Sequence, residues 1–501
     1  MSEADATMSQ PAEKLTPVNE VAGPRVRDVL PGMEGHPLLA ELMDVEVPAA
    51  LKPVVDPKEY AHRSFKDGEF WRHIPGYAEV DRATFLDWKF QNKQSVTSVD
   101  KLVATLGNLA SPAFIDDVRA GIARAPMNVR LSPYTVALID WANPYQDPLR
   151  IQFLPVGSTQ LPDHPRLTLD SLHEQADAPT PGLTHRYYDK ALFLPLDVCP
   201  VYCRFCTRSY AIGGDTDTVH KARLTPNAKR WHTDIAYIAS RPEIEDIVVS
   251  GGDLYMLPAQ HVSTIGHLLL AIPHIRRIRI ATKGPAVSPM KILTDEAWTA
   301  ALFEIANAGR AMGKEVCLHT HFNTPQEITE ITRQAMEVLF KGGVTVRNQT
   351  VLIRNVNDSV ATMTELVRRL SYMNVRPYYV YQHDMVSAVE ELRTTVQTNA
   401  SIERGVRGST AGFNTPLAIV DLPGGGGKRD VHSFEHYDRT TGISVYRSPA
   451  VHADLVYLYF DPIDLLPKEG QERWSRPAEH QRMIDEAIGT AGLTGMPLAV
   501  A

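Results

Sequence analysis

The sequence predicts an α/β fold in which parallel strands form most of a barrel. Short apolar runs rich in β-branched residues recur after about residue 190. Longer segments with helical periodicity separate these runs. Most successive runs begin about 30 to 40 residues apart, which is the length of a strand–helix–strand unit. Near-continuous apolar strands joined by helices indicate a parallel sheet, and six such units close or nearly close into a partial (β/α)6 barrel.

The individual elements follow from these patterns. The predicted strands are, in order, residues 191–196, 246–250, 276–282, 315–322, 344–353, 376–382 and 416–423. The predicted helices lie between them, at residues 228–240, 259–272, 294–312, 325–343 and 359–374. Several of these segments place apolar residues at positions i, i+3, i+4 and i+7, which forms one buried helix face.

The rest of the chain lacks this alternation. We predict a disordered or irregular N-terminal extension at residues 1–75, a mainly helical region at 76–185, the barrel core at 186–428 and a short C-terminal extension at 429–501. Neither a secretory signal nor a run of about 18 apolar residues is present, so no membrane association is expected. The net charge of −8 gives no general attraction to nucleic acid. With only four cysteines in 501 residues, a reducing cytoplasmic setting is expected.

Unusual residues gather at the carboxyl ends of the predicted strands. Cys199 follows the first strand, Gly251 follows the second and His321 ends the fourth. Asp384 follows the sixth strand, and Asp421 lies at the end of the seventh. Parallel α/β folds collect their chemistry at this edge, so we expect one functional site there.

Three of the four cysteines, Cys199, Cys203 and Cys206, lie within eight residues of one another. Three thiolates on one short loop can bind a [4Fe–4S] cluster and leave one iron open to a small molecule. Two alternatives are a zinc site completed by a distant ligand and a redox pair of Cys203 and Cys206. The fourth cysteine, Cys317, lies within a predicted strand and is expected in the core.

A second motif is the glycine run that precedes Lys428. Residues 421–428 have the sequence DLPGGGGK. A phosphate-binding P-loop is not matched, because Leu422 takes the place of its first glycine and Arg429 that of its Ser or Thr. One interpretation is a flexible surface loop that ends in a solvated lysine. The other is a compliant loop that presents a lysine amine to the aldehyde of pyridoxal phosphate.

Together the two motifs resemble the lysine 2,3-aminomutase family. The cysteine spacing resembles the radical S-adenosylmethionine signature, and SGGD at 250–253 resembles that superfamily's glycine-rich turn. The resemblance runs from about Asp87 to about Pro449, and from His321 to Lys428 it needs no gap. Its other segments are PGLTHRYYDK (181–190), HTHFN (319–323), VRNQTVLIRNVND (346–358) and RPYYVYQHD (376–384). It implies a radical-SAM partial barrel and an isomerase that moves an α-amino group to Cβ, giving a β-amino acid.

The resemblance also implies a role for each matching residue. Cys199, Cys203 and Cys206 would bind the [4Fe–4S] cluster, and Lys428 would bind pyridoxal 5′-phosphate. Residues expected near S-adenosyl-L-methionine are Ser250, Gly251, Gly252, Asp253, His321 and Gln349. Residues expected near the pyridoxal group are Arg186, Tyr187, Lys190 and Tyr381. Arg208 matches an arginine that pairs with the α-carboxylate of the substrate.

Asp384 and Asp421 bear on the substrate. They match two aspartates that bind the side-chain ammonium in lysine-specific members, and the glutamate-specific members lack this pair. Two carboxylates facing one pocket repel each other unless a cation neutralises them. We therefore expect a cationic amino acid, L-lysine first, with arginine or another amino acid as the alternative.

The resemblance implies a homo-oligomer and a low-potential, flavodoxin- or ferredoxin-like electron donor. Lysine-specific members of known bacterial type bind a structural zinc through further cysteines, and Ser359 stands where one of them would be. We therefore expect an oligomer without that zinc. Two other functions are a radical enzyme acting on a protein lysine and a zinc-binding nucleic-acid module. The acidic net charge and the lack of a second metal half-site argue against the module.

Overall fold

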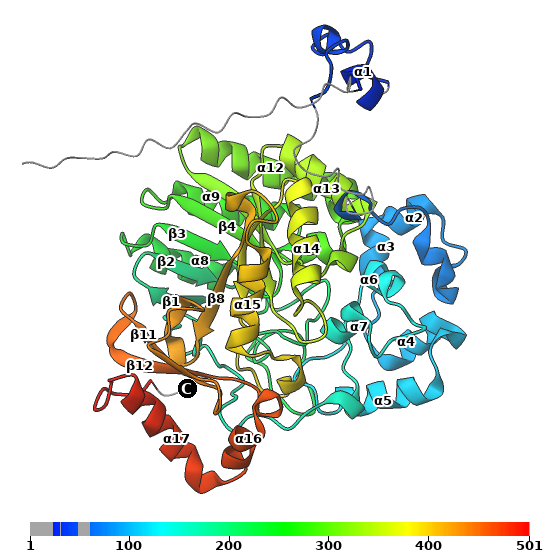
Figure 1. Ribbon diagram of the computed structural model, residues 1–501. Helices are drawn as coiled ribbons and strands as arrows, with labels where there is room; N and C mark the ends of the chain where they lie inside the picture. The colour runs from blue at the N-terminus through cyan, green and yellow to red at the C-terminus, as the bar shows by residue number, and fades with distance from the viewer. Residues whose placement is uncertain (1–23, 31, 49–60, 500–501) are drawn as a thin grey trace, which may run out of the picture. The chain divides into compact units, whose positions relative to one another are not determined.

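The computed structural model describes residues 24–30, 32–48 and 61–499 (Figure 1). The chain forms two compact units, Met1–Tyr60 and Ala61–Ala501. The described part of the first unit contains helix α1 (Val26–Val29) and a bridge between Arg25 and Glu46. The disorder expected for residues 1–23 lies outside the described residues.

The second unit is built on a nine-stranded sheet whose strands lie side by side in chain order. Strands β2 to β8 are parallel, and an antiparallel strand flanks them at each end. The seven predicted strands are confirmed as β2 to β8, whereas β1 and β9 were not predicted. The bounds are β1 Leu183–Tyr187, β2 Lys190–Phe193, β3 Asp246–Val249, β4 Arg277–Ala281, β5 Glu315–Thr320, β6 Val346–Val351, β7 Arg376–Tyr381, β8 Leu417–Leu422 and β9 Gly427–Asp430.

Six helical crossovers connect the parallel strands and lie outside them (Figure 1). The predicted partial (β/α)6 barrel is therefore confirmed. The crossover helices are α8 Ala228–Ala239, α9 Ala259–Ala271, α10 Gly284–Val287, α11 Met290–Thr294, α12 Glu296–Ala311, α13 Glu330–Lys341, α14 Val360–Tyr372 and α15 Val396–Val406. Helix α15 was not predicted because its sequence is largely polar, and it buries Asn399 among its few apolar side chains.

The two edges of the sheet approach each other. The backbone N–H of Lys428 in β9 donates a hydrogen bond of 2.7 Å to the hydroxyl of Tyr187 in β1. A Cβ atom on Gly427 would lie 2.5 Å from the same hydroxyl, so only glycine permits this approach. The sheet is therefore nearly closed.

Short helices precede the barrel. They are α2 Arg82–Leu86, α3 Trp88–Lys93, α4 Val99–Leu106, α5 Pro112–Ile122, α6 Pro133–Leu138 and α7 Pro148–Phe153. The compact units divide after Tyr60, so residues 61–75, assigned above to the N-terminal extension, lie in the second unit. Trp71 is fully buried there and stacks on Phe85 with ring centroids 4.1 Å apart.

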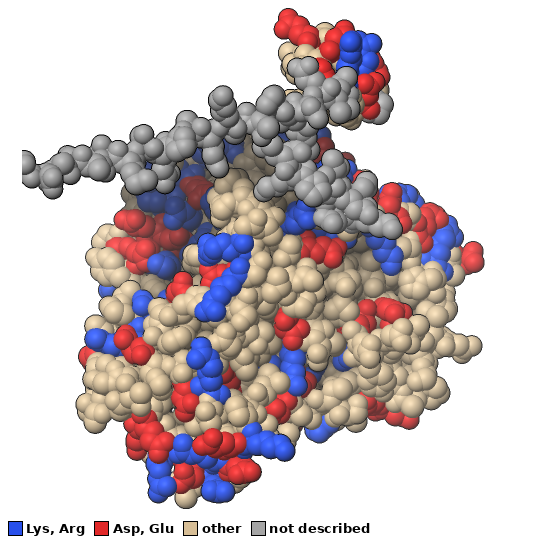
Figure 2. Space-filling model, viewed as in Figure 1, with Lys and Arg blue, Asp and Glu red and all other residues tan. Residues whose placement is uncertain are grey.

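A small antiparallel sheet follows the barrel, and the sequence did not predict it. Its strands are β10 His436–Asp438, β11 Ile443–Ser448 and β12 His452–Phe460, followed by α16 Lys468–Trp474 and α17 Pro477–Thr490. Val445, Tyr457 and Ile484 belong to its own apolar cluster. Figure 2 shows acidic and basic side chains interspersed on α16 and α17. Within the part of the chain that the structure describes, no helix combines the length and apolarity that crossing a bilayer requires.

Replacing Trp71 tests the assignment of residues 61–75 to the core. Trp71→Ala removes the stack on Phe85 and the hydrogen bond from the indole N–H to Val80 O. We expect a loss of about 3–5 kcal/mol of stability from the cavity that remains. Thermal unfolding followed by circular dichroism measures this loss. Phe340→Ala, at a side chain that is 57% exposed, is the control and should shift the melting temperature little; equal shifts would contradict the assignment.

Candidate active site

A cavity of about 520 Å³ lies inside the barrel, and every predicted site residue lines it. The strands contribute one group, which comprises Arg186, Tyr187, Lys190, Gln349, Tyr381, Asp421 and Lys428. The loops after the strands contribute the rest, which comprises Cys199, Cys203, Cys206, Arg208, Ser250, Gly251, Gly252, Asp253, His321 and Asp384. All of these residues therefore line one cavity, and the contributing loops follow the carboxyl ends of the strands, as expected.

The glycine turn after β3 packs against the chain that leads into the cysteine loop. The backbone N–H of Gly252 donates to Leu196 O at 2.6 Å, and that of Asp253 donates to Val198 O at 2.9 Å. A Cβ atom on Gly252 would lie 2.5 Å from backbone atoms of Val198. Glycine is therefore required here for the approach of two backbones, whatever else the turn binds.

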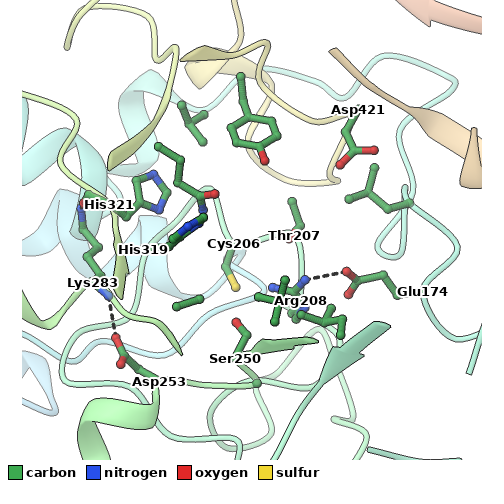
Figure 3. A pocket seen from close by; sticks show the side chains of 18 of the residues that line it. Glu174, Cys206, Thr207, Arg208, Ser250, Asp253, Lys283, His319, His321 and Asp421 are labelled. Atoms are coloured by element: carbon green, nitrogen blue, oxygen red, sulfur yellow. Dashed lines mark hydrogen bonds and ion pairs between the residues drawn. The ribbon is translucent and has the colours of Figure 1, made fainter. Parts of the chain in front are cut away.

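The three clustered cysteines are free thiols that face the cavity, and Cys206 is visible there in Figure 3. Burial raises the pKa of all three thiols, that of Cys203 to about 12, so thiolates need a cationic partner. Among the described residues, no three His, Cys, Asp or Glu side chains converge on a position for one metal ion. A [4Fe–4S] cluster takes its thiolates on separate irons, so three thiols on one loop could hold such a cluster.

Asp253 has a structural explanation of its own. Its carboxylate accepts hydrogen bonds from the backbone N–H groups of Tyr255 at 2.9 Å and Lys283 at 2.8 Å (Figure 3). Burial raises the pKa of Asp253 to about 6. This carboxyl group therefore ties the loop after β3 to the loop after β4.

Lys283 is a cavity residue that sequence reasoning missed. Its ammonium donates to His321 O at 2.7 Å and to Glu327 Oε1 at 2.8 Å. His321 packs against Phe205 with ring centroids 5.5 Å apart, and its Nε2 is buried without a partner. Lys283 lies two residues after β4, so the strand-end rule that selected His321 would also have selected it.

The ammonium of Lys428 lies in the cavity beside Asp421. Its Nζ is 2.7 Å from Asp421 Oδ2, and the rings of Tyr381 and Tyr187 lie 5.6 and 5.9 Å from it. Desolvation lowers the pKa of Lys428, but the charge of Asp421, the charge of Tyr187 and the hydrogen bond to Asp421 together raise this pKa above its ordinary value. The side chain is 35% exposed, so a ligand in the cavity can reach it.

The glycine run before Lys428 is a defined turn rather than a flexible or compliant loop. Gly424, Gly425 and Gly427 have positive φ values of 74°, 86° and 72°. A Cβ atom on Gly426 would lie 2.6 Å from the Tyr457 ring. The interpretation as a flexible surface loop was therefore wrong, because conformation and packing both demand glycine here.

Asp384 and Asp421 both line this cavity. Asp384 is 9% exposed, and Oδ1 of each carboxylate is buried without a hydrogen-bond partner. Burial and the charge of Asp421 raise the pKa of Asp384 well above its ordinary value. Unpaired buried carboxylate oxygens are unfavourable, which indicates a site for a cationic ligand.

The basic residues expected near the pyridoxal group are held by acidic neighbours. Arg186 Nε donates to Asp177 Oδ2 at 2.7 Å. Lys190 pairs with Asp189, and its ammonium lies 4.7 Å from the centre of the Tyr187 ring. Together with Lys428, these residues present cations to the same side of the cavity, which suits a phosphate-bearing aldehyde.

Two aromatic residues that sequence reasoning missed support Gln349. The Tyr378 hydroxyl donates to Gln349 Oε1 at 3.2 Å, and His319 Nδ1 lies 3.1 Å from that hydroxyl. His319 Nε2 is buried without a partner. His319 and Tyr378 lie within strands, where the sequence pattern gave no signal beyond ordinary core packing. Unpaired polar atoms at His319, His321 and the two aspartates fit a cavity that receives polar ligands.

Known proteins were compared with the chain. No protein-family model matches it. L-lysine 2,3-aminomutase from Fusobacterium nucleatum is 38% identical over 347 residues, which cover 69% of this chain and 76% of the relative. L-lysine 2,3-aminomutase from Clostridium subterminale is 36% identical over 357 residues, covering 71% and 80%. Glutamate 2,3-aminomutase from Clostridioides difficile is 30% identical over 396 residues, covering 77% and 88%.

Among solved structures, a radical SAM methyltransferase from Sphaerobacter thermophilus aligns with a TM-score of 0.33 and 17% identity. The alignment covers 48% of this chain and 68% of the methyltransferase. This similarity is too low to support an inference about the site.

Loss of any of the three cavity thiols should lower the iron content of the protein, whereas loss of Cys317 should not. Anaerobically reconstituted wild type should contain about four iron and four sulfide per chain. Changing Cys199, Cys203 or Cys206 to Ala should remove most of this iron and the brown absorption. Cys317→Ala is the control, because Cys317 is buried in β5 and absent from the cavity lining. Full iron content in any of the three loop variants would contradict the assignment.

Proposed function

The chain belongs to the lysine 2,3-aminomutase family and is an isomerase, and we propose that it moves the α-amino group of L-lysine to Cβ. The acid pair formed by Asp384 and Asp421 carries this proposal, because both residues line the cavity that holds Lys428 and each has one carboxylate oxygen without a hydrogen-bond partner. Identity supports it as well, since relatives named L-lysine 2,3-aminomutase are 33–38% identical and a relative named glutamate 2,3-aminomutase is 30% identical.

Membership in the family implies S-adenosylmethionine and a [4Fe–4S] cluster, and we propose pyridoxal phosphate as the third group. Cys199, Cys203 and Cys206 would hold the cluster, and Lys428 would hold the pyridoxal aldehyde. When bound, these groups supply a carbon-centred radical and a pyridine ring that delocalises an unpaired electron. The chain itself supplies binding, orientation and charge.

The substrate ends are recognised by opposite charges. The Arg208 guanidinium suits the α-carboxylate, because its planar donors match two carboxylate oxygens. Asp384 and Asp421 suit the side-chain ammonium, which supplies the cation that two neighbouring carboxylates require. A glutamate side chain would place a third carboxylate beside this pair and be repelled.

Lys428 must lose a proton before its amine can attack an aldehyde. Asp421 Oδ2, 2.7 Å from Nζ, now accepts a hydrogen bond from that ammonium and keeps it charged. A substrate ammonium would offer Asp421 the same charge that Nζ offers now. Once Lys428 holds the aldehyde, its ammonium would no longer neutralise Asp421, and the substrate ammonium would supply that charge instead.

Further features of the assembly remain proposals. Ser359 Oγ accepts a hydrogen bond from Thr362 N at 3.1 Å and begins helix α14. This capping role explains a serine there without any metal, and we propose a homo-oligomer without the structural zinc. We also propose a flavodoxin- or ferredoxin-like electron donor and a cytoplasmic location.

The acid pair predicts the order of substrates. Reduced wild type supplied with S-adenosylmethionine should isomerise L-lysine far faster than L-glutamate, with arginine as the second candidate. Asp384→Asn should lower kcat/KM for lysine roughly 30- to 700-fold, which corresponds to a loss of about 2–4 kcal/mol of binding free energy. Derivatised chromatography of the mass-neutral products measures this. Asp430→Asn, at an exposed position in β9, should leave turnover unchanged. Turnover of glutamate without lysine would refute the substrate assignment.

Lys428 is expected to be required for retention of the pyridoxal group. Lys428→Ala leaves no amine beside Tyr187 and Tyr381 to react with the aldehyde, so the absorption band of bound pyridoxal should be lost after gel filtration. Turnover should fall below detection. Lys341→Ala changes a lysine with a 72% exposed side chain and should retain both properties. An unchanged absorption spectrum in the Lys428 variant would contradict this role.

A further inference from the structure

Glu174 is a buried carboxylate in the cavity lining that the proposed function leaves without a role. It precedes β1 and is only 4% exposed. One oxygen accepts a hydrogen bond of 2.6 Å from Arg208 Nη2, and the other accepts one of 3.1 Å from the Tyr210 hydroxyl. Figure 3 shows Glu174 on the far side of Arg208 from Cys206. Each oxygen of Glu174 therefore accepts one hydrogen bond, from Arg208 and from Tyr210 respectively.

The backbone around Glu174 is fixed by its neighbours. The Asp170 carboxylate accepts hydrogen bonds from the N–H groups of Glu174 and Gln175, each at 3.0 Å. Ser171 O accepts the N–H of Gly424 at 2.9 Å, which ties this segment to the turn before Lys428. Glu174 is thus held on a rigid support that also contacts the turn carrying Lys428.

Arg208 retains donors for a ligand. Glu174 accepts from its Nη2, while the side chain lines the cavity and is 21% exposed. A guanidinium carries five N–H donors, and a carboxylate in the cavity is the ligand that suits them best. The bond to Glu174 restricts the orientations that the guanidinium can adopt toward the cavity.

Charge gives a second reason for the pair. Arg208 and the two aspartates line the same cavity, and the unpaired oxygens of Asp384 and Asp421 would attract a mobile guanidinium. Contact of Arg208 with those aspartates would occupy both ends of the substrate site at once. Glu174 supplies Arg208 with a carboxylate partner of its own and leaves the acid pair available for an ammonium.

We propose that Glu174 is a positioning residue that sets Arg208 to bind the α-carboxylate of the amino-acid substrate and keeps it away from Asp384 and Asp421. This inference rests on the proposed function. Its consequence is that Glu174 matters only for ligands that carry a free carboxylate. Lysine and lysinamide differ in that group alone, so the pair of ligands isolates the contribution.

The test is a binding titration that needs no reductant and no turnover. Protein loaded with pyridoxal phosphate is titrated with L-lysine and with L-lysinamide, and the change in the pyridoxal absorption gives each Kd. Glu174→Gln keeps the shape of the side chain and removes its charge. We expect lysine binding to weaken roughly 10- to 100-fold and lysinamide binding to change less than about 2-fold. Glu174→Asp, which restores the charge, should recover part of the loss.

Controls separate this inference from the proposed function. Glu245→Gln, at an exposed carboxylate outside the cavity lining, should leave both Kd values unchanged. Equal weakening of lysine and lysinamide, or no weakening of either, would overturn the role of Glu174 while leaving the function intact. A wild-type protein that gives no response to lysine would instead overturn the proposed function and this inference with it. If the Gln variant does not fold, the Asp variant, which draws the charge back by one methylene, should weaken lysine binding to a smaller extent and still change lysinamide binding less than about 2-fold.

Discussion

The contact between the two edges of the sheet sets the geometry of the whole site. The backbone N–H of Lys428 reaches the hydroxyl of Tyr187 at 2.7 Å, and this joins the last strand of the sheet to the first. Because seven parallel strands lie between these edges, their carboxyl ends face one enclosed cavity. Cysteines at the start of the barrel and a lysine at its end therefore meet, although about 220 residues separate them.

Within that cavity, charge is divided between fixed places. Arg208 is paired with Glu174 on one side, and Lys428 is paired with Asp421 on another. Each cation thus has its own carboxylate partner, and Asp384 has none among these cations. Asp384, with an unpaired oxygen and a raised pKa, is the group that most needs an incoming cation. The site is thus arranged for a zwitterion with an additional positive charge.

Local sequence patterns predicted the barrel because its strands and helices obey their own periodicities. The seven parallel strands and five crossover helices followed from apolar spacing, and the cysteine and glycine motifs marked the cavity. Glu174 was missed because it lies in an irregular turn where no strand end points to it. Helix α15 was missed because it is largely polar, and Asp253 has structural duties that spacing alone does not reveal. Apolar spacing along the chain cannot predict the role of a residue that depends on a partner distant in sequence.

The C-terminal sheet shows why such partners matter for specificity. Tyr459 of β12 donates its hydroxyl to His383 O at 2.8 Å, and Gln382 Nε2 donates to that hydroxyl at 3.1 Å. Both bonds hold the segment immediately before Asp384. The side chains of Gln382, His383 and Tyr459 are all fully buried. A carboxylate with an unpaired oxygen and a raised pKa keeps its place only if its backbone is fixed by other contacts. The extension after the barrel therefore supports the proposed substrate site, since it fixes the segment that carries Asp384.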